Sequence, residues 1–252
     1  MSKKSTIIMI HGFRGTHSGL INIAKNLRDD YNVLTPDIPG SGKSPELDNK
    51  TLDGYADWLH DYIKTQKLKK PYIIGHSMGS IIVSHFVQKY PKDVQSKVIL
   101  LSPVFRTKSG QKRSDVAYNI CRGGLQILPA KQRQKFLASH QLSYIISHFL
   151  TYDKSQQKQI DVLHCKYSGK FASVDSFMAD MRISMREQTI IPENFDTLLC
   201  FGEHDRLTSH KLIEKIATQN GASYREFSDA GHLINYETPD RVAKAIKDFI
   251  SR

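Results

Sequence analysis

Short apolar runs alternate with longer amphipathic segments along most of this 252-residue chain. The runs have the length of strands, and the segments between them repeat apolar residues at helical spacing. Continuous apolar strands that alternate with helices predict an α/β fold, a mostly parallel central sheet covered by helices on both faces. The predicted strands are residues 6–10, 31–35, 71–75, 97–102, 197–202 and 222–227, and the predicted helices lie near 18–29, 51–67, 79–90, 208–219 and 237–250.

The interval 105–191 interrupts this alternation. It lacks apolar strand runs, and its segments 131–150 and 173–188 have helical periodicity. Gly123-Gly124, Pro129 and Gly169 are predicted to separate its elements. We therefore expect one core domain made of residues 1–104 and 192–252, with a helical insertion at 105–191.

The insertion also carries most of the excess positive charge. It contains 14 Lys and Arg residues against 6 Asp and Glu residues, in a chain whose net charge is +11. Such a surface aids solubility, and it also attracts anionic substrates or anionic membrane surfaces. No strongly apolar amphipathic stretch favours the membrane. Nucleic-acid binding is not expected, because the basic residues are scattered and no nucleic-acid motif is present.

A candidate nucleophile lies in Gly75-His76-Ser77-Met78-Gly79, between a predicted strand and a predicted helix. In this context G-x-S-x-G predicts a sharp turn that presents the serine oxygen at the carboxyl edge of the sheet. A serine hydroxyl is a poor nucleophile near neutral pH unless a base takes its proton and a third group orients the base. Ser77 is therefore our candidate nucleophile, on condition that the chain supplies both partners.

Both partners follow later strands. Asp205 ends the segment TLLCFGEHD, and His232 lies between the last predicted strand and the last predicted helix. We expect His232 to act as the base and Asp205 to orient it. Asp229 is the one rival acid, and a turn or capping role suits it better. We interpret six other histidines as structural: His11, His60, His85, His140, His148 and His164. His204 and His210, near the acid, are interpreted as surface residues.

An acyl-transfer serine also needs two backbone N–H groups directed at the developing oxyanion. One is expected from Met78, which follows the nucleophile, and the other from Phe13, in the turn after the first strand. Arg14 is a candidate contact for a substrate carboxylate, with an exposed loop arginine as the alternative. His76 is a candidate pocket residue.

Together these motifs resemble the α/β-hydrolase fold superfamily. The resemblance rests on HGF at 11–13, PDIPGSGKS at 36–44, GHSMG at 75–79, FGEHD at 201–205 and AGHLINYETPDRVAKAIKDFI at 230–250, which occur in the order typical of that family. It implies that residues 105–191 take the place of the family's variable cap. It also implies that GSGKS belongs to a D-x-x-G-x-G-x-S loop beside the active site. A phosphate-binding loop would need glycine at position 37, where Asp37 stands.

We expect a serine hydrolase that cleaves an ester or related acyl bond of a small substrate, with a carboxylate group as one option. Two alternatives stay open: a C–C bond hydrolase or lyase without a cofactor that uses the same triad, and a non-catalytic ligand-binding module of this fold. No cofactor or metal is expected, since the sequence has neither HExxH nor CxxC.

Three separated cysteines favour a reducing, cytoplasmic location. The apolar run 7–10 is too short for a secretion signal, and no run approaches the roughly 18 residues of a transmembrane helix. The sequence leaves the physiological substrate and the oligomeric state open.

Overall fold

The structure, a computed structural model, describes residues 4–167 and 169–252. Six strands form one sheet in the order β2-β1-β3-β4-β5-β6, and every neighbouring pair is parallel. This confirms the predicted parallel sheet, and each strand lies within two residues of its predicted bounds. The strands are β1 (Thr6–Ile10), β2 (Asn32–Leu34), β3 (Tyr72–His76), β4 (Lys97–Leu101), β5 (Asp196–Gly202) and β6 (Ser223–Phe227).

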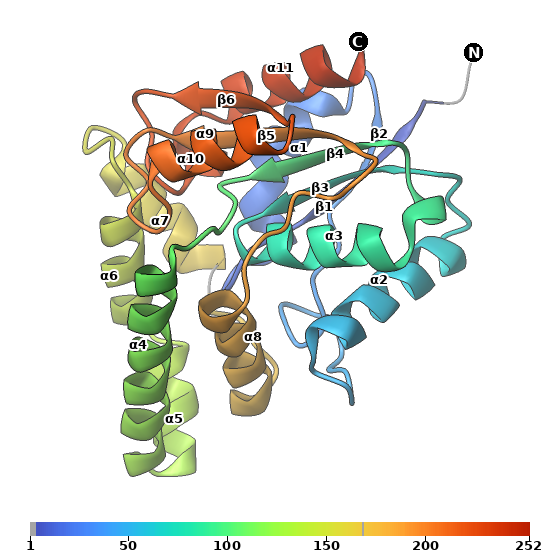
Figure 1. The fold of residues 1–252 in the computed structure, drawn as a ribbon. Coiled ribbons are helices and arrows are strands. Elements are labelled where there is room, and N and C mark those ends of the chain that lie inside the picture. Colours follow the sequence, from blue (N-terminus) through green and yellow to red (C-terminus); the bar gives the residue numbers. More distant parts are fainter. Residues whose placement is uncertain (1–3, 168) are drawn as a thin grey trace.

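Helices cover both faces of the sheet, as the continuous apolar strands predicted (Figure 1). Alternate strand residues such as Ile7 and Ile8 belong to opposite core clusters. Helices α1 (Ile21–Leu27) and α11 (Pro239–Ile250) pack on one face, and α2 (Leu52–Thr65), α3 (Met78–Lys89) and α9 (His210–Gln219) contribute to the other. The short elements η1 (His17–Leu20), η2 (Pro91–Asp93) and α10 (Ile234–Glu237) lie in connections.

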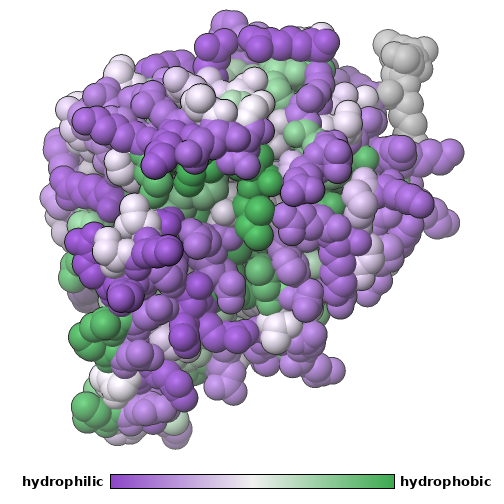
Figure 2. All heavy atoms as spheres, in the orientation of Figure 1, coloured by the Kyte–Doolittle hydropathy of each residue, from purple (hydrophilic) through white to green (hydrophobic). Residues whose placement is uncertain are grey.

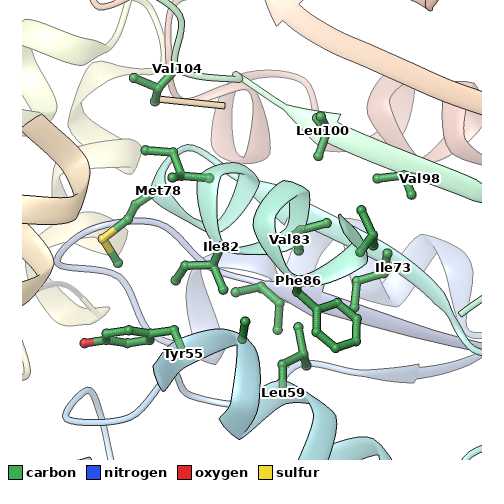
Figure 3. Close-up of a cluster of buried hydrophobic side chains, with 14 of the residues drawn as sticks. Tyr55, Leu59, Ile73, Met78, Ile82, Val83, Phe86, Val98, Leu100 and Val104 are labelled. Atoms are coloured by element: carbon green, nitrogen blue, oxygen red, sulfur yellow. The ribbon is translucent and has the colours of Figure 1, made fainter. Parts of the chain in front are cut away.

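Helix α3 lies deepest in the core, which matters because it begins directly after Ser77. Its buried residues include Ile82, Val83 and Phe86, which lie between the sheet and the side chains of α2 (Figure 3). Such dense packing on both sides fixes the start of the helix relative to the sheet. The helix ends before Pro91, where the sequence predicted that it could not continue.

Residues 105–191, which we call the insertion, form helices between β4 and β5 (Figure 1, lower left). The predicted segment 131–150 is divided into α5 and α6, because the Ser139 hydroxyl accepts a hydrogen bond from Leu142 N–H and caps a new helix. The helices are α4 (Lys108–Ile127), α5 (Ala130–Leu137), α6 (His140–Leu150), α7 (Gln157–Tyr167) and α8 (Val174–Arg186).

The predicted break at Gly123-Gly124 is wrong, because α4 runs through both glycines. A Cβ atom added at either position meets nothing within 4 Å, so packing does not require glycine there. Pro129 and Gly169 do mark boundaries: Pro129 precedes α5, and Gly169 adopts a φ of +69° after α7. Within the described residues, none of the helices has the length and hydropathy needed to cross a bilayer.

Candidate active site

Ser77 occupies a strained turn between β3 and α3. Its φ of +54° and ψ of −121° lie in a region that non-glycine residues rarely adopt. The two glycines of the motif make the turn sterically feasible. A Cβ atom on Gly75 would lie 2.3 Å from the carbonyl oxygen of Gly79, and one on Gly79 would lie 2.3 Å from that of Ile10. The G-x-S-x-G spacing therefore has a direct packing cause.

The structure brings the three predicted catalytic residues into one hydrogen-bonded row. Nε2 of His232 lies 2.9 Å from Oγ of Ser77, and Nδ1 of His232 lies 2.7 Å from Oδ2 of Asp205. All three side chains are buried. With Nδ1 protonated and bonded to the carboxylate, Nε2 is free to accept the hydroxyl proton. The row has the geometry that nucleophilic catalysis by serine requires.

Backbone contacts hold Asp205 and His232 in place. The second carboxylate oxygen of Asp205 accepts hydrogen bonds from the N–H groups of Leu207 at 2.7 Å and Thr208 at 3.2 Å. The N–H of His232 donates to the carbonyl of Leu150, at the end of α6. The imidazole position thus depends on the insertion as well as on the core.

A cavity of about 90 Å³ adjoins Ser77. Its lining includes Ser77, His232, Gly12 and the predicted oxyanion donor Phe13. The side chain of Met78, the other predicted donor, is buried in the core below α3 (Figure 3), so its backbone is the part near Ser77. A Cβ atom on Gly12 would lie 2.9 Å from Cβ of Ser77, which shows how closely the turn after β1 approaches this serine.

The two candidate substrate contacts have different surroundings. His76 lines the cavity and is buried, and burial, with nearby His232, lowers its pKa to about 3. It is therefore a neutral group at neutral pH. Arg14 is also buried rather than exposed. Its guanidinium donates to the carbonyl of Leu137 at 2.6 Å and to the Ser143 hydroxyl at 3.0 Å, which connects the turn after β1 to the insertion.

Sequence reasoning missed two histidines of the cavity wall. His11 and His164 were interpreted as structural, yet both line this cavity. Burial lowers the pKa of each, to about 4 for His164. His164 gave no signal in the sequence, since it lies on α7, far from every motif, whereas His11 belongs to the HGF motif itself. The rival acid Asp229 lies on the surface instead, where it pairs with Arg241 at 2.6 Å.

The loop that contains GSGKS folds around Asp37 and against the insertion. The carboxylate of Asp37 accepts hydrogen bonds from the N–H groups of His17 at 2.6 Å and Lys43 at 3.2 Å. Gly42 N–H donates to the carbonyl of Lys170 at 2.8 Å. The glycine amides that a phosphate loop would use are thus engaged with the protein, and no helix follows directly.

A larger apolar chamber adjoins the cavity within the insertion. Its volume is about 520 Å³, and it shares Phe13, Arg14 and Ile146 with the cavity beside Ser77. The rest of its wall comes from α4 and the residue after it, and from α5, α6 and α8: Cys121, Gly124, Leu125, Leu128, Phe136, Leu137, Leu142, Phe177, Met181 and Met185. The shared residues make the chamber and the cavity neighbours across a common wall.

Among the described residues, no group of three His, Cys, Asp or Glu side chains could hold a metal ion.

Comparisons with known proteins agree with this fold. Residues 5–239 match the alpha/beta hydrolase fold family. Among curated proteins, the chain is 26% identical to an uncharacterized hydrolase, YugF, of Bacillus subtilis, over 98% of this chain and 90% of the other. It is 24% identical to Lipase 1 of Psychrobacter immobilis, over 97% and 76% respectively.

Among solved structures, a thermophilic esterase from Thermogutta terrifontis superposes with a TM-score of 0.74 at 19% identity, covering 99% of this chain and 90% of the esterase. An esterase from Exiguobacterium antarcticum gives the same TM-score at 17% identity, covering 100% and 94%. These structures share the fold, and the sequence relatives support hydrolase activity. The match over 5–239 shows that this chain belongs to the alpha/beta hydrolase fold family.

Proposed function

We propose that the protein is a serine esterase in which Ser77, His232 and Asp205 act as one catalytic unit. The hydrogen-bonded row of these three side chains carries the proposal. Ser77 Oγ attacks the ester carbonyl while His232 Nε2 takes its proton, and Asp205 stabilises the imidazolium. The proton then passes to the departing alkoxide, which leaves an acyl-serine. Water, deprotonated by His232, hydrolyses this intermediate and restores the hydroxyl.

The backbone N–H groups of Phe13 and Met78 form the oxyanion hole in this proposal. Met78 opens α3, so its N–H is one of the amides that a helix leaves without an internal partner. Phe13 lines the cavity beside Ser77. Two such donors stabilise the negative oxygen of the tetrahedral intermediate, and each contributes about 10²–10³-fold in turnover.

We assign residues 105–191 the role of a cap that selects the substrate. The apolar chamber next to the cavity has a volume typical of ligand sites and can accept the apolar acyl or alcohol part of an ester. The guanidinium of Arg14 is bonded to the insertion, so we assign it a positioning role. A substrate that carries a carboxylate remains a prediction. To bind that carboxylate, Arg14 would have to exchange its hydrogen bonds to Leu137 and Ser143 for bonds to the substrate.

The first experiment measures hydrolysis of nitrophenyl acetate by the wild type, by Ser77→Ala and by Ser155→Ala. Ser155 is an exposed serine on the insertion and serves as the control. The proposal expects Ser77→Ala to lose about 10⁴-fold or more in kcat and the control to keep wild-type turnover. Wild-type turnover of the ester by Ser77→Ala would overturn the proposal.

The second experiment tests the chamber with nitrophenyl esters of increasing acyl length. Leu128→Trp and Met185→Trp place bulk inside the chamber, whereas Ile127→Trp, next to Leu128, lies outside it as a control. We expect the two chamber variants to lose activity on long esters and to keep it on the acetate. Chain-length profiles that are identical in all variants would exclude the chamber as a substrate site.

Labelling and binding measurements distinguish the two alternative functions. If a phosphonate probe labels Ser77 but no ester is hydrolysed, the triad serves a C–C bond hydrolase or lyase instead. If the wild type and Ser77→Ala bind a ligand equally and neither converts esters, thioesters or diones, the protein is a binding module.

A further inference from the structure

The outer surface of the insertion exposes many apolar side chains. Most of the exposed large hydrophobic residues among those described belong to residues 105–191, and Ile127 reaches 84% exposure. Figure 2 shows hydrophobic atoms at the surface in the region of the insertion, at lower left. Isolated apolar residues are ordinary on a surface, but a gathering on neighbouring helices indicates an interaction site. On α4, α5 and α6 they are Val116, Ile120, Ile127, Phe136, Tyr144, Ile145 and Phe149.

On α4 these residues form a stripe. Val116, Ile120 and Ile127 are separated by four and seven positions, which places them on one side of the helix. Gly123 lies between them on the same side, and a Cβ atom there would meet nothing within 4 Å. The stripe therefore has no covering element within the described structure around Gly123.

Basic residues accompany the apolar ones. Residues 107–150 contain seven Lys and Arg residues and one acidic residue, Asp115. Asp115 pairs with Arg186 of α8 at 3.3 Å, so its charge is offset within the insertion. The basic residues are Lys108, Lys112, Arg113, Arg122, Lys131, Arg133 and Lys135. This charge opposes the approach of a second copy of the same face and favours an anionic partner.

We propose that the outer face of α4, α5 and α6, called here the basic apolar face, docks on an anionic lipid surface. Apolar side chains enter the boundary between headgroups and acyl chains, while the lysine and arginine side chains contact lipid phosphates. Membrane-surface helices combine apolar and basic residues in this way. No single stretch of the sequence indicated such a face, because its exposed apolar residues are divided among α4, α5 and α6.

The face adjoins the apolar chamber. Cys121 and Leu125 of α4 line the chamber, while Val116 and Ile120 lie on the exposed side of the same helix. Phe136 belongs to both, because it lines the chamber and is 50% exposed. Docking would thus bring the chamber next to the lipid. This consequence for substrate access rests on the proposed esterase function, whereas docking itself does not.

Co-flotation with vesicles tests the proposal. The probes are vesicles of phosphatidylcholine alone and of phosphatidylcholine mixed equally with phosphatidylglycerol, and the protein carries Ser77→Ala so that no lipid is hydrolysed. We expect binding to the anionic vesicles that weakens as salt is added, because added ions screen the attraction. Absence of binding to anionic vesicles at low salt would overturn the proposal, whatever the outcome of the esterase assays.

Charge reversals on two helices provide a matched comparison. Lys112→Glu with Arg113→Glu alters the face, and Lys211→Glu with Lys215→Glu makes the same change on α9 of the core, where both lysines are exposed. At about 1 kcal/mol for each basic residue near the lipid, the first pair should weaken binding by at least about tenfold and the second much less. If both double variants lose vesicle binding equally, the attraction depends on overall charge and not on a docking face.

Ile120→Asp with Ile127→Asp tests the apolar contribution. We expect this variant to lose vesicle binding while it keeps the turnover of a soluble acetate ester measured in the active background. Light scattering tests whether a second copy of the chain covers the face instead. If the protein forms a concentration-dependent dimer that this variant abolishes, and neither protein binds vesicles, the face is a dimer interface. That result would overturn the proposal.

Discussion

Ser77 keeps a backbone conformation that costs on the order of 1–3 kcal/mol, and the surrounding packing holds it there. Its N–H donates to the carbonyl of Leu101 at 2.9 Å, and its carbonyl accepts from Ser80 N–H at 2.8 Å. These bonds tie the strained residue to β4 and to the first turn of α3. The serine oxygen therefore has a fixed direction before any substrate arrives.

Gly12→Ala tests how much turnover depends on this close packing. The added Cβ would lie 2.9 Å from Cβ of Ser77 and 3.1 Å from the carbonyl of His76, so the turn that carries Phe13 has to shift. We expect kcat for a soluble ester to fall by about 10²-fold, as when an oxyanion donor is displaced. Gly123→Ala is the control, because its Cβ meets nothing. Unchanged turnover in Gly12→Ala would contradict the assignment of this turn.

Among the elements, α8 joins the insertion to the core through a buried acid. Asp180 of α8 accepts a hydrogen bond of 2.5 Å from the Tyr55 hydroxyl of α2. Burial raises the pKa of Asp180 to about 7, even though this hydrogen bond favours the charged form. Above the ordinary carboxyl pKa the unfolded chain releases this proton while the folded protein retains it. Asp180 therefore lowers the stability as the pH rises from about 4 to about 7.

Asp180→Asn should remove this dependence on pH, because an amide oxygen can still accept the hydrogen bond from the Tyr55 hydroxyl and the side chain does not titrate. We expect its free energy of unfolding to exceed that of the wild type by on the order of 2 kcal/mol near neutral pH, and by less near pH 4. Urea titrations across this range measure the difference. If the difference in free energy of unfolding between the two proteins stays constant with pH, the result contradicts the raised pKa of Asp180.

The core elements were predictable from sequence, and the insertion was less so. The strand at 71–75 is a continuous apolar run buried on both faces, which gives a strong pattern, and Tyr90-Pro91 stops α3 for a local reason. In the insertion, Gly123-Gly124 resembles a break, but the surrounding residues of α4 keep the helix intact. The prediction from local glycine content therefore placed a helix boundary where the helix continues.

The candidate site shows the same contrast between local and distant information. Ser77 and Met78 could be located because G-x-S-x-G is a local motif. Asp205 and His232 could be located because parallel strands end at one edge of the sheet. His164 reaches the cavity only through the packing of α7. The guanidinium bonds of Arg14 also join distant segments, so its burial could not be predicted from the residues around it.

For the whole molecule, the buried histidines predict sensitivity to acid. Burial lowers the pKa of His11, of His76 to about 3 and of His164 to about 4, so the folded protein keeps them neutral. Below about pH 6.5 the unfolded chain binds protons that the folded protein excludes, so stability falls as the pH falls. Asp180 and Glu237 act in the opposite direction, because burial raises the pKa of both carboxyl groups, but three buried histidines oppose these two acids.

Chemical unfolding at about pH 7 and about pH 5 measures the net effect. We expect the free energy of unfolding to be lower at the acidic value by on the order of 3 kcal/mol. Equal or greater stability at the acidic value would contradict the neutral, buried state of these histidines.

The catalytic row is tested most directly by locating the adduct of a fluorophosphonate probe with mass spectrometry. Such a probe reacts with a serine whose hydroxyl proton is taken by a base, so the wild type should carry one adduct, on Ser77. His232→Gln should react far more slowly, since it lacks the base, and Ser77→Ala should carry no adduct. An adduct on another residue, or equal labelling rates in the wild type and His232→Gln, would contradict the account.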